Sequence, residues 1–169
     1  TAVVANLPYN VSVPVLLHLL ETFPSLKSGV VMVQAEVGHR IAADPGSKVY
    51  GSPSAKAAWY GRWKTVGTVS RQVFWPVPNV DSVLVGFERG TSLPGTEAER
   101  VRTFALVDAA FGQRRKMLRQ ALSSFFGDSQ TASAVIEAAG ISPMARGESL
   151  TILDFLAIAR QQVPAVPAE

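Results

Sequence analysis

The sequence opens with Ala2-Val3-Val4-Ala5-Asn6-Leu7-Pro8-Tyr9, which gives the first indication of its fold class. Its first four residues are a short continuous apolar run, which ends in a loop that contains a proline. Such a run is typical of a parallel strand that is buried on both faces, and not of an amphipathic strand. We therefore predict that the chain opens inside a sheet and that the polar loop follows the first strand directly.

A parallel βαβ unit is predicted around this loop. Ser12 and Pro14 form a helix-start signal, and the following apolar stripe consists of Leu16, Leu17, Leu20 and Phe23. The stripe stops before Pro24, and residues 30–34 form a second apolar run with the character of a buried strand. Strand, helix and strand in this order predict two parallel strands joined by a crossover helix.

Two short helices and two further strands are predicted next. The helices are expected over residues 36–43 and from Ser52-Pro53 to Gly61, with Ser52 as the N-cap. Val, Thr and aromatic residues are frequent over residues 63–73 and 80–88, which favours strands. The expected connection between these strands is Phe74-Trp75-Pro76-Val77-Pro78-Asn79.

A change of composition separates this portion from a helical one. The stretch Gly90-Thr91-Ser92-Leu93-Pro94-Gly95-Thr96 has the character of a linker, and no strand pattern follows it. One helix face is predicted from Val101, Phe104, Val107 and Phe111, and a second from Met117, Leu118, Ala121, Leu122 and Phe125. A third helix is expected over residues 131–139, and Thr151-Ile152-Leu153-Asp154 resembles a capping box that opens the last.

Composition excludes several classes of site. The 169 residues include no cysteine, which excludes disulfides and thiolate metal sites. His18 and His39 lack a ligand spacing, so we expect both on helix surfaces and expect no metal. The sequence shows no secretory leader and no apolar run long enough for a bilayer, which predicts a cytoplasmic protein. The net charge of +3 is compatible with nucleic acid binding without requiring it.

The loop Asn6-Leu7-Pro8-Tyr9 resembles the (Asp/Asn/Ser)-X-Pro-(Tyr/Phe) loop of methyltransferases that modify exocyclic amines of bases. An adenine N6 is a poor nucleophile because its lone pair is delocalised into the ring. Acceptors on its two hydrogens would localise the lone pair and stabilise the positive charge that develops during methyl transfer. We predict that the Asn6 side chain and the Leu7 carbonyl are these acceptors. Pro8 would keep the preceding residue extended, and Tyr9 offers a stacking face for the flipped base. A plain strand-to-helix turn is the alternative.

The stretch Phe74-Trp75-Pro76-Val77-Pro78-Asn79-Val80-Asp81-Ser82 resembles a longer and rarer signature. This signature, Phe-X-Pro-X-Pro-X-Val-Asp-Ser, is typical of the ribosomal RNA adenine N6-dimethyltransferases of the small ribosomal subunit. The resemblance implies that Phe74 closes over the target adenine opposite Tyr9, where stacking is worth roughly 1–3 kcal/mol per base. Trp75 is expected to pack and not to take part in catalysis. An aromatic hairpin loop whose prolines protect a sheet edge is the alternative.

The resemblance extends along the whole chain. Further family motifs, in family order, are Gln34-Ala35-Glu36-Val37 with Arg40, Gly46-Ser47-Lys48-Val49-Tyr50-Gly51, Phe111-Gly112-Gln113-Arg114-Arg115-Lys116, and Gly140-Ile141-Ser142-Pro143 with Arg146 and Glu148. Two positions depart from the family: Ala35 stands where many members carry Lys, and Gly112 where Asn is common. Neither position belongs to the predicted N6 pocket.

The resemblance implies a fold class and a domain organisation. The fold would be α/β, the C-terminal part of a Rossmann-like class I methyltransferase sheet followed by a small all-α domain. Accordingly, we expect the partial methyltransferase domain over residues 1–90, a linker over 91–96, a helical RNA-binding domain over 97–162 and a flexible tail over 163–169.

The methyl donor implied by the resemblance is S-adenosylmethionine. Asn6, Leu7 and Pro8 would border its methyl end, at the carboxyl end of the first strand. No Gly-X-Gly-X-X-Gly turn occurs in the sequence. Most of the donor site is therefore expected to be missing together with an N-terminal half, and the chain alone is expected to be inactive because nothing orients the donor.

The substrate implied is a pair of adjacent adenines in 16S ribosomal RNA, each dimethylated on N6 by a monomeric enzyme during ribosome biogenesis. An erythromycin-resistance-type methylase of 23S ribosomal RNA shares the Asn-X-Pro-Tyr loop and is the nearest alternative. The basic triplet at residues 114–116 and the stretch at 140–143 favour the small subunit. A non-catalytic ribosome-assembly module is a further alternative, against which Asn6, Tyr9 and Phe74 argue.

Positive charge is concentrated in the helical portion. Between Glu99 and Phe125 there are six Lys or Arg residues against two carboxylates. The triplet Arg114-Arg115-Lys116 is predicted at a helix N-terminus, where it would oppose the helix dipole. With Arg119 one turn on, and Arg100 and Arg102 before it, the triplet predicts phosphate binding. The predicted RNA contacts are Arg114, Arg115, Lys116, Arg119, Arg71 and Lys48. A solvated basic face is the alternative.

Overall fold

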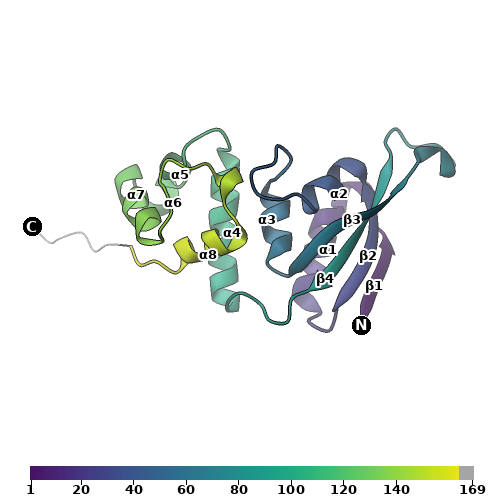
Figure 1. The fold of residues 1–169 in the computed structure, drawn as a ribbon, viewed down its shortest axis with the longest axis horizontal. Helices are drawn as coiled ribbons and strands as arrows, with labels where there is room; N and C mark the ends of the chain where they lie inside the picture. Colours follow the sequence, from purple (N-terminus) through teal and green to yellow (C-terminus); the bar gives the residue numbers. More distant parts are fainter. Residues whose placement is uncertain (164–169) are drawn as a thin grey trace, which may run out of the picture. The chain divides into compact units, whose positions relative to one another are not determined.

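The fold is given by a computed structural model that describes residues 1–163. The chain divides into two compact units (Figure 1): Thr1–Asp44 with Val49–Leu93, and Pro45–Lys48 with the chain from Pro94 onward. The division falls inside the expected linker at residues 91–96, whereas the transfer of Pro45–Lys48 to the second unit has no signal in the sequence. Apart from Val163, the tail expected over residues 163–169 lies outside the described residues.

A four-stranded sheet with the order β1-β2-β4-β3 forms the basis of the first unit. β1 (Ala2–Asn6) pairs parallel with β2 (Ser28–Gln34), and α1 (Ser12–Thr22) joins them. β4 (Ser82–Arg89) pairs antiparallel with β2 on one side and with β3 (Gly61–Val69) on the other. The predicted βαβ unit and the α/β fold class are therefore confirmed.

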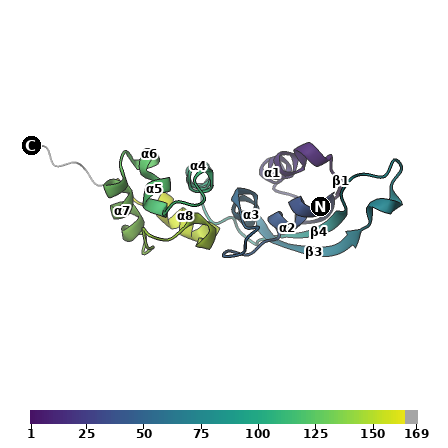
Figure 2. The ribbon, with the colours of Figure 1, turned by 90° about the horizontal axis from the view of Figure 1, so that it is seen from above.

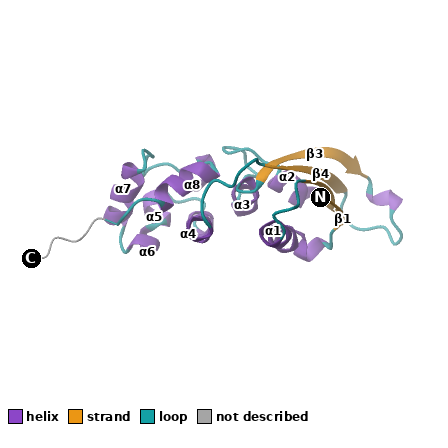
Figure 3. Cartoon of the chain, turned by 90° about the horizontal axis from the view of Figure 1, so that it is seen from below, coloured by secondary structure: helices purple, strands orange, loops and turns teal. Residues whose placement is uncertain are grey.

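Three helices lie on one side of this sheet (Figures 2 and 3). They are α1, α2 (Ala35–Ile41) and α3 (Ser52–Ala58), and α3 begins at Ser52 with Gly51 as its N-cap. The buried apolar side chains of the sheet and of α1 are Val31, Val33, Val83, Val85, Phe87, Leu16 and Leu20. Leu16 and Leu20 belong to the predicted stripe, so the helical periodicity identified the buried face of α1.

The other side of the sheet corrects the prediction that β1 is buried. Val4 is 84% exposed, and Val30, its register partner on β2, is 37% exposed. Among the described strands β1 pairs with β2 alone. Because side chains alternate along a strand, every second residue of β1 faces the uncovered side. The apolar run thus predicted the strand correctly but not its burial.

The connection between β3 and β4 is longer than predicted. Arg71–Val73 form the 3₁₀ helix η2 instead of the end of a strand, and β4 begins only at Ser82. The Ser70 hydroxyl accepts a backbone hydrogen bond at the start of η2 at 3.3 Å. The Asp81 carboxylate accepts another from the Arg71 backbone N–H at 2.9 Å. These side chains satisfy backbone donors that a strand ladder would otherwise use.

The second unit is helical. Its elements are α4 (Glu97–Gly112), α5 (Leu118–Ala121), α6 (Ser123–Phe126), α7 (Ser129–Ala138) and α8 (Ile152–Ala159). The largest buried side chains include Leu106, Leu118, Leu122, Ile136, Phe155 and Ile158. None of the helices within residues 1–163 is long and apolar enough to cross a bilayer.

Two predictions for these helices are wrong. The buried face of α4 consists of Thr103, Leu106, Val107 and Ala110, whereas Val101 is 56% exposed. The single helix expected around residues 117–125 is two short helices. Leu122 leaves helical geometry (φ −96°, ψ 3°), and the Ser123 hydroxyl donates to the Gln120 carbonyl at 2.8 Å. Such side-chain bonds compete with the helix ladder.

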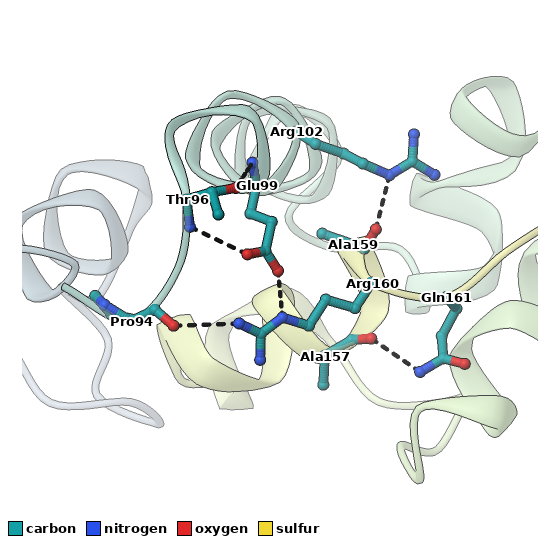
Figure 4. Close-up of polar contacts among 8 residues, drawn as sticks. All are labelled: Pro94, Thr96, Glu99, Arg102, Ala157, Ala159, Arg160 and Gln161. Atoms are coloured by element: carbon teal, nitrogen blue, oxygen red, sulfur yellow. Dashed lines mark hydrogen bonds and ion pairs between the residues drawn. The ribbon is translucent and has the colours of Figure 1, made fainter.

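The N-terminus of α4 is capped and connected to the end of α8 (Figure 4). The Glu99 N–H donates to Thr96 Oγ1 at 3.2 Å, and the Thr96 N–H donates to Glu99 Oε1 at 3.1 Å, which is a capping box. The Glu99 carboxylate also accepts a hydrogen bond from Arg160, which reaches the Pro94 carbonyl at 3.2 Å. The bond from Arg160 and the backbone bond at Thr96 lower the pKa of Glu99 to about 2.

We expect the second unit to lose stability in acid as Glu99 becomes protonated. The pKa of Glu99 in the folded state, about 2, lies below its ordinary value of 4.5. The stabilisation is therefore complete above the ordinary value and is lost as the pH falls through the folded value. Thermal unfolding measured from about pH 5 down to about pH 2 should show a shallower pH dependence for Glu99→Gln than for the unchanged chain. Glu137→Gln, at an exposed position on α7, is the control. An unaltered slope in Glu99→Gln would contradict this linkage.

Candidate functional site

The two sequence motifs meet in one hollow of the first unit. Asn6 ends β1, and residues 7–9 follow it directly; all four line this hollow together with Phe74, Trp75, Pro76 and Pro78. Its volume is about 470 Å³. Ligands of α/β sheets bind outside the carboxyl ends of the strands, and residues 6–9 stand at that end of β1. The structure thus brings the predicted loop and the predicted second wall to the same space.

Leu7 anchors the loop at the sheet. Its side chain is buried, and its backbone N–H donates to the Met32 carbonyl on β2 at 3.1 Å. Pro8 has φ −58° and ψ 136°, and the 3₁₀ helix η1 (Tyr9–Val11) begins after it. Asn6 is exposed. A fixed backbone with an accessible polar side chain is what recognition of a small polar group requires.

A hydrogen bond joins the two motifs. Tyr9 Oη and Ser82 Oγ are 3.0 Å apart, and Ser82 is fully buried at the start of β4. Near this point the Ala35 N–H donates to the Asp81 carbonyl at 3.0 Å. Ser82, the last residue of the Phe-X-Pro-X-Pro-X-Val-Asp-Ser pattern, therefore orients the ring of Tyr9. The sequence predicted no role for Ser82, although its fixed place in the signature was a signal for one.

We expect Tyr9→Phe to lower the free energy of unfolding by about 1 kcal/mol, because it removes this bond and leaves the buried Ser82 hydroxyl unpaired. Ser82→Ala removes the same bond from the other side. Since one bond can be broken only once, the double variant should lose less than the sum of the two single losses. Urea denaturation measures all three variants. Strictly additive losses would show that the two hydroxyls do not interact.

Trp75 does not pack, contrary to expectation. Its side chain is 94% exposed, and the neighbouring Val73 and Val77 are 68% and 53% exposed. Phe74, by contrast, is only partly exposed. Successive side chains of an extended segment point in opposite directions, and Phe74 is extended, with φ −105° and ψ 150°. Both residues line the hollow, and Trp75 is the one whose ring stands almost wholly in solvent.

A second hollow of about 350 Å³ is formed by residues 34–36, Arg71 and residues 79–81. Arg71, a predicted RNA contact, lies here, and its guanidinium donates to the Asn79 carbonyl at 2.9 Å. Ala35, where many family members carry Lys, belongs to the same wall. Arg71 thus stabilises the loop that carries Phe74 in addition to any contact with RNA.

The basic triplet lies in a turn, which corrects the prediction of a helix N-terminus. α4 ends at Gly112, and α5 starts only at Leu118, so residues 114–116 follow the carboxyl end of α4. Positive charge near that end of a long helix is favourable. The triplet therefore does not oppose a helix dipole, and a role in RNA binding stays a prediction.

Arg114 is occupied within the second unit. Its Nη2 donates to the Lys48 carbonyl at 2.6 Å, and its Nε lies 3.3 Å from the Glu148 carboxylate. The Gly46 N–H donates to the Glu148 carbonyl at 2.7 Å. These contacts hold Pro45–Lys48 to the 3₁₀ helix η3 (Gly147–Ser149). Through the bond to Lys48, Arg114 connects the two distant motifs at residues 46–51 and 111–116.

The remaining predicted basic contacts differ in accessibility. Arg115, Lys116 and Lys48 are exposed, and Arg119 is partly exposed. Arg100 is paired with Glu97 at 2.8 Å, and its side chain is 12% exposed. Arg102 donates to the Ala159 carbonyl at 2.8 Å and lies 5.4 Å from the centre of the Phe125 ring. Arg100 is therefore paired within α4, whereas Arg102 connects α4 with α8 and α6.

The described residues offer no cluster of side chains that could hold a metal ion. His18 on α1 and His39 on α2 are both exposed, as predicted.

The fold of this chain matches two solved methyltransferase structures. The chain superposes on the crystal structure of a dimethyladenosine transferase from Plasmodium falciparum with a TM-score of 0.80 and 23% identity, covering 93% of this chain and 64% of the other. For the 23S rRNA methyltransferase ErmE the TM-score is 0.66 at 21% identity, covering 94% and 63%. The fold is therefore that of a Rossmann-like methyltransferase.

The family follows from sequence. A model of the ribosomal RNA adenine dimethylase family matches residues 1–162, and the chain belongs to this family. The ribosomal RNA small subunit methyltransferase A of Leifsonia xyli subsp. xyli is 72% identical over 156 residues, which cover 92% of this chain and 56% of the relative. The corresponding protein of Streptomyces avermitilis is 58% identical, covering 96% and 55%. The chain thus spans about half the length of the curated relatives it matches.

Proposed function

We propose that this chain carries the adenine pocket of an enzyme that dimethylates N6 of two adjacent adenines in small-subunit ribosomal RNA. The observation that supports it is the meeting of residues 6–9 with Phe74 in one hollow, in a member of the ribosomal RNA adenine dimethylase family. The names of relatives that are 72% and 58% identical favour the small subunit over the 23S alternative. The likeness to ErmE is one of fold.

In this proposal Asn6 and Leu7 activate the nucleophile. The Asn6 side-chain oxygen and the Leu7 carbonyl accept hydrogen bonds from the two N6 hydrogens of the adenine. These bonds withdraw the nitrogen lone pair from the ring and stabilise the positive charge that N6 gains in the transition state. The bond from the Leu7 N–H to Met32 fixes the backbone that presents the carbonyl.

Tyr9 and Phe74 hold the flipped base between them. Each offers an aromatic face, and stacking on one face is worth roughly 1–3 kcal/mol. Tyr9, one wall, is hydrogen-bonded to Ser82 at the start of β4. β4 directly follows the loop that carries Phe74, the other wall. The separation of the walls is therefore set before the base arrives, which lowers the entropic cost of binding.

S-adenosylmethionine supplies the methyl group as a sulfonium. The exposed Asn6, at the carboxyl end of β1, fits a place beside the methyl end of this donor. We propose that Asn6, Leu7 and Pro8 border the donor, and that the rest of its site lies in the half of the relatives that this chain does not span. Accordingly, the isolated chain should neither methylate RNA nor bind S-adenosylmethionine tightly. Tight binding in a calorimeter would contradict this.

The proposed RNA contacts of the second unit are Arg115, Lys116, Arg119 and Lys48, and the first unit contributes Arg71 separately. Their exposure suits them to phosphate contacts, which position RNA without reading its sequence. Arg114 contributes indirectly, because its bond to the Lys48 carbonyl holds the segment that carries Lys48. Because the proposed substrate is bacterial ribosomal RNA, we place the action in the cytoplasm, and the protein acts there as a monomer.

The experiment that tests the function uses a protein that carries this chain at the full length of its relatives, called the full-length protein below. Methyl transfer from labelled S-adenosylmethionine is measured with precursor small subunits and, separately, with 23S ribosomal RNA. We expect N6,N6-dimethyladenine in the small-subunit RNA alone. Methylation of 23S RNA would establish the alternative, and an absence of methylation with normal binding to precursor subunits would establish an assembly module.

A further inference from the structure

We propose that Trp75 stacks on an RNA base next to the target adenine, outside the hollow, and so keeps the strand open while the target is inside. This inference rests on the proposed function, since it concerns the same RNA strand. It adds a positioning residue at a place where the family signature specifies no residue type.

The position of Trp75 carries the inference. The residue borders the hollow of residues 6–9, yet its side chain is 94% exposed. Phe74, the preceding residue, lines the same hollow but is only partly exposed. The two rings therefore serve different bases, one inside the hollow and one at its rim.

The loop presents this ring in a fixed way. Pro76 and Pro78 restrict the backbone after it, and Arg71 binds the loop at its far end through the Asn79 carbonyl at 2.9 Å. The Asp81 carboxylate accepts from the Arg71 N–H at 2.9 Å, which closes the loop. A pre-positioned aromatic ring loses little entropy when it stacks.

The chemistry of the rim favours a nucleic acid base as the occupant. Removing a base from its stack leaves its neighbours with an open face, and apolar or aromatic wedges commonly fill such gaps. Of the aromatic residues that line the proposed adenine hollow, Trp75 is the one whose side chain is almost wholly exposed. Arg71, which precedes Trp75 by four residues, is exposed and provides the positive charge that an RNA backbone needs.

Tryptophan fluorescence offers a direct readout, because the three tryptophans differ in environment. Trp59 is 2% exposed. Trp63 donates to the Ala57 carbonyl at 2.8 Å and packs on Phe87, with ring centroids 4.5 Å apart. In the full-length protein we expect a hairpin RNA with two adjacent loop adenines to quench the emission. Trp75→Phe should abolish that quenching.

Kinetics on precursor small subunits give the second readout. We expect Trp75→Leu, which keeps bulk but has no aromatic face, to raise the KM for RNA roughly tenfold, in line with the loss of one stacked base. Trp75→Phe should raise it less, and Val77→Ala, in the same exposed loop, should leave it unchanged. The affinity for S-adenosylmethionine should be the same in all variants.

Several outcomes would overturn the inference and leave the proposed function intact. They are an unchanged KM in Trp75→Leu, quenching that persists in Trp75→Phe, and protection of Trp75 from acrylamide in the free full-length protein, which would mean that the ring is packed. A defect on precursor particles but not on the same RNA free of protein would assign Trp75 to a protein contact instead. If the unchanged protein methylates no RNA at all, the proposed function itself fails.

Discussion

Asn6→Ala should reduce kcat for adenine methylation by about 10²–10³-fold in the full-length protein, the loss seen when one pre-positioned polar group is removed from a transition state. Asn6 is exposed at the hollow, while the backbone beside it is fixed by the bond from Leu7 to Met32. The substitution should therefore remove an acceptor without moving the loop. Single-turnover methylation of precursor small subunits measures the effect.

Two control variants test whether the loss is specific to the acceptor at position 6. Asn10→Ala removes the same amide from an exposed position four residues on, and it should leave kcat unchanged. Asn6→Asp keeps an oxygen acceptor and should restore part of the activity. RNA affinity should be similar in all three variants, because phosphate contacts supply most of it. A kcat for Asn6→Ala within a few fold of the unchanged protein would remove Asn6 from the mechanism.

The sequence predicted the elements of the site better than their surroundings. Periodicity identified the βαβ unit and the stripe of Leu16 and Leu20, and the capping box at Thr151 is confirmed, with the Asp154 N–H bonded to the Thr151 hydroxyl at 3.1 Å. These signals are local, because each depends on residues within one or two turns. The prediction that β1 is buried was wrong, because the burial of a strand depends on what covers each side of the sheet.

Contacts between distant residues were the part that the sequence could not supply. Tyr9 and Ser82 are 73 positions apart, and Arg114 and Lys48 are 66 apart. Family resemblance grouped these residues by motif but gave no reason for the grouping. The hydrogen bonds provide it: Ser82 orients a wall of the hollow, and Arg114 holds Pro45–Lys48. The basic triplet was also misplaced for want of such contacts: it lies in a turn between α4 and α5 and not at the start of a helix.

Gly38 is a residue of the first unit where adding a single methyl group should destabilise the fold. It lies on α2, where the helix approaches the sheet. A Cβ at this position would be 2.1 Å from Val83 Cγ2, 2.9 Å from Val85 Cγ2 and 3.1 Å from Val33 Cγ2. Each of these valines is at most 1% exposed. Because a buried, β-branched side chain has little freedom to rotate away, α2 itself must move.

We expect Gly38→Ala to lower the free energy of unfolding by about 2 kcal/mol, since overpacking a well-filled core typically costs 1–3 kcal/mol and exceeds the gain of up to about 1 kcal/mol from replacing glycine in a helix. Urea denaturation measures the loss. The matched control is Gly67→Ala on β3, where the nearest atom to a new Cβ is Leu84 Cδ1 at 3.5 Å, an ordinary contact.

The same substitution should also reach the site. α2 begins at Ala35, whose N–H donates to the Asp81 carbonyl, one residue before the Ser82 that orients Tyr9. Displacement of α2 should therefore loosen the wall of the hollow and lower kcat of the full-length protein under conditions where the variant is still folded. Gly67→Ala should change neither property. If Gly38→Ala unfolds at the same urea concentration as the unchanged chain, the close packing of α2 on β4 is not what holds this side of the hollow in place.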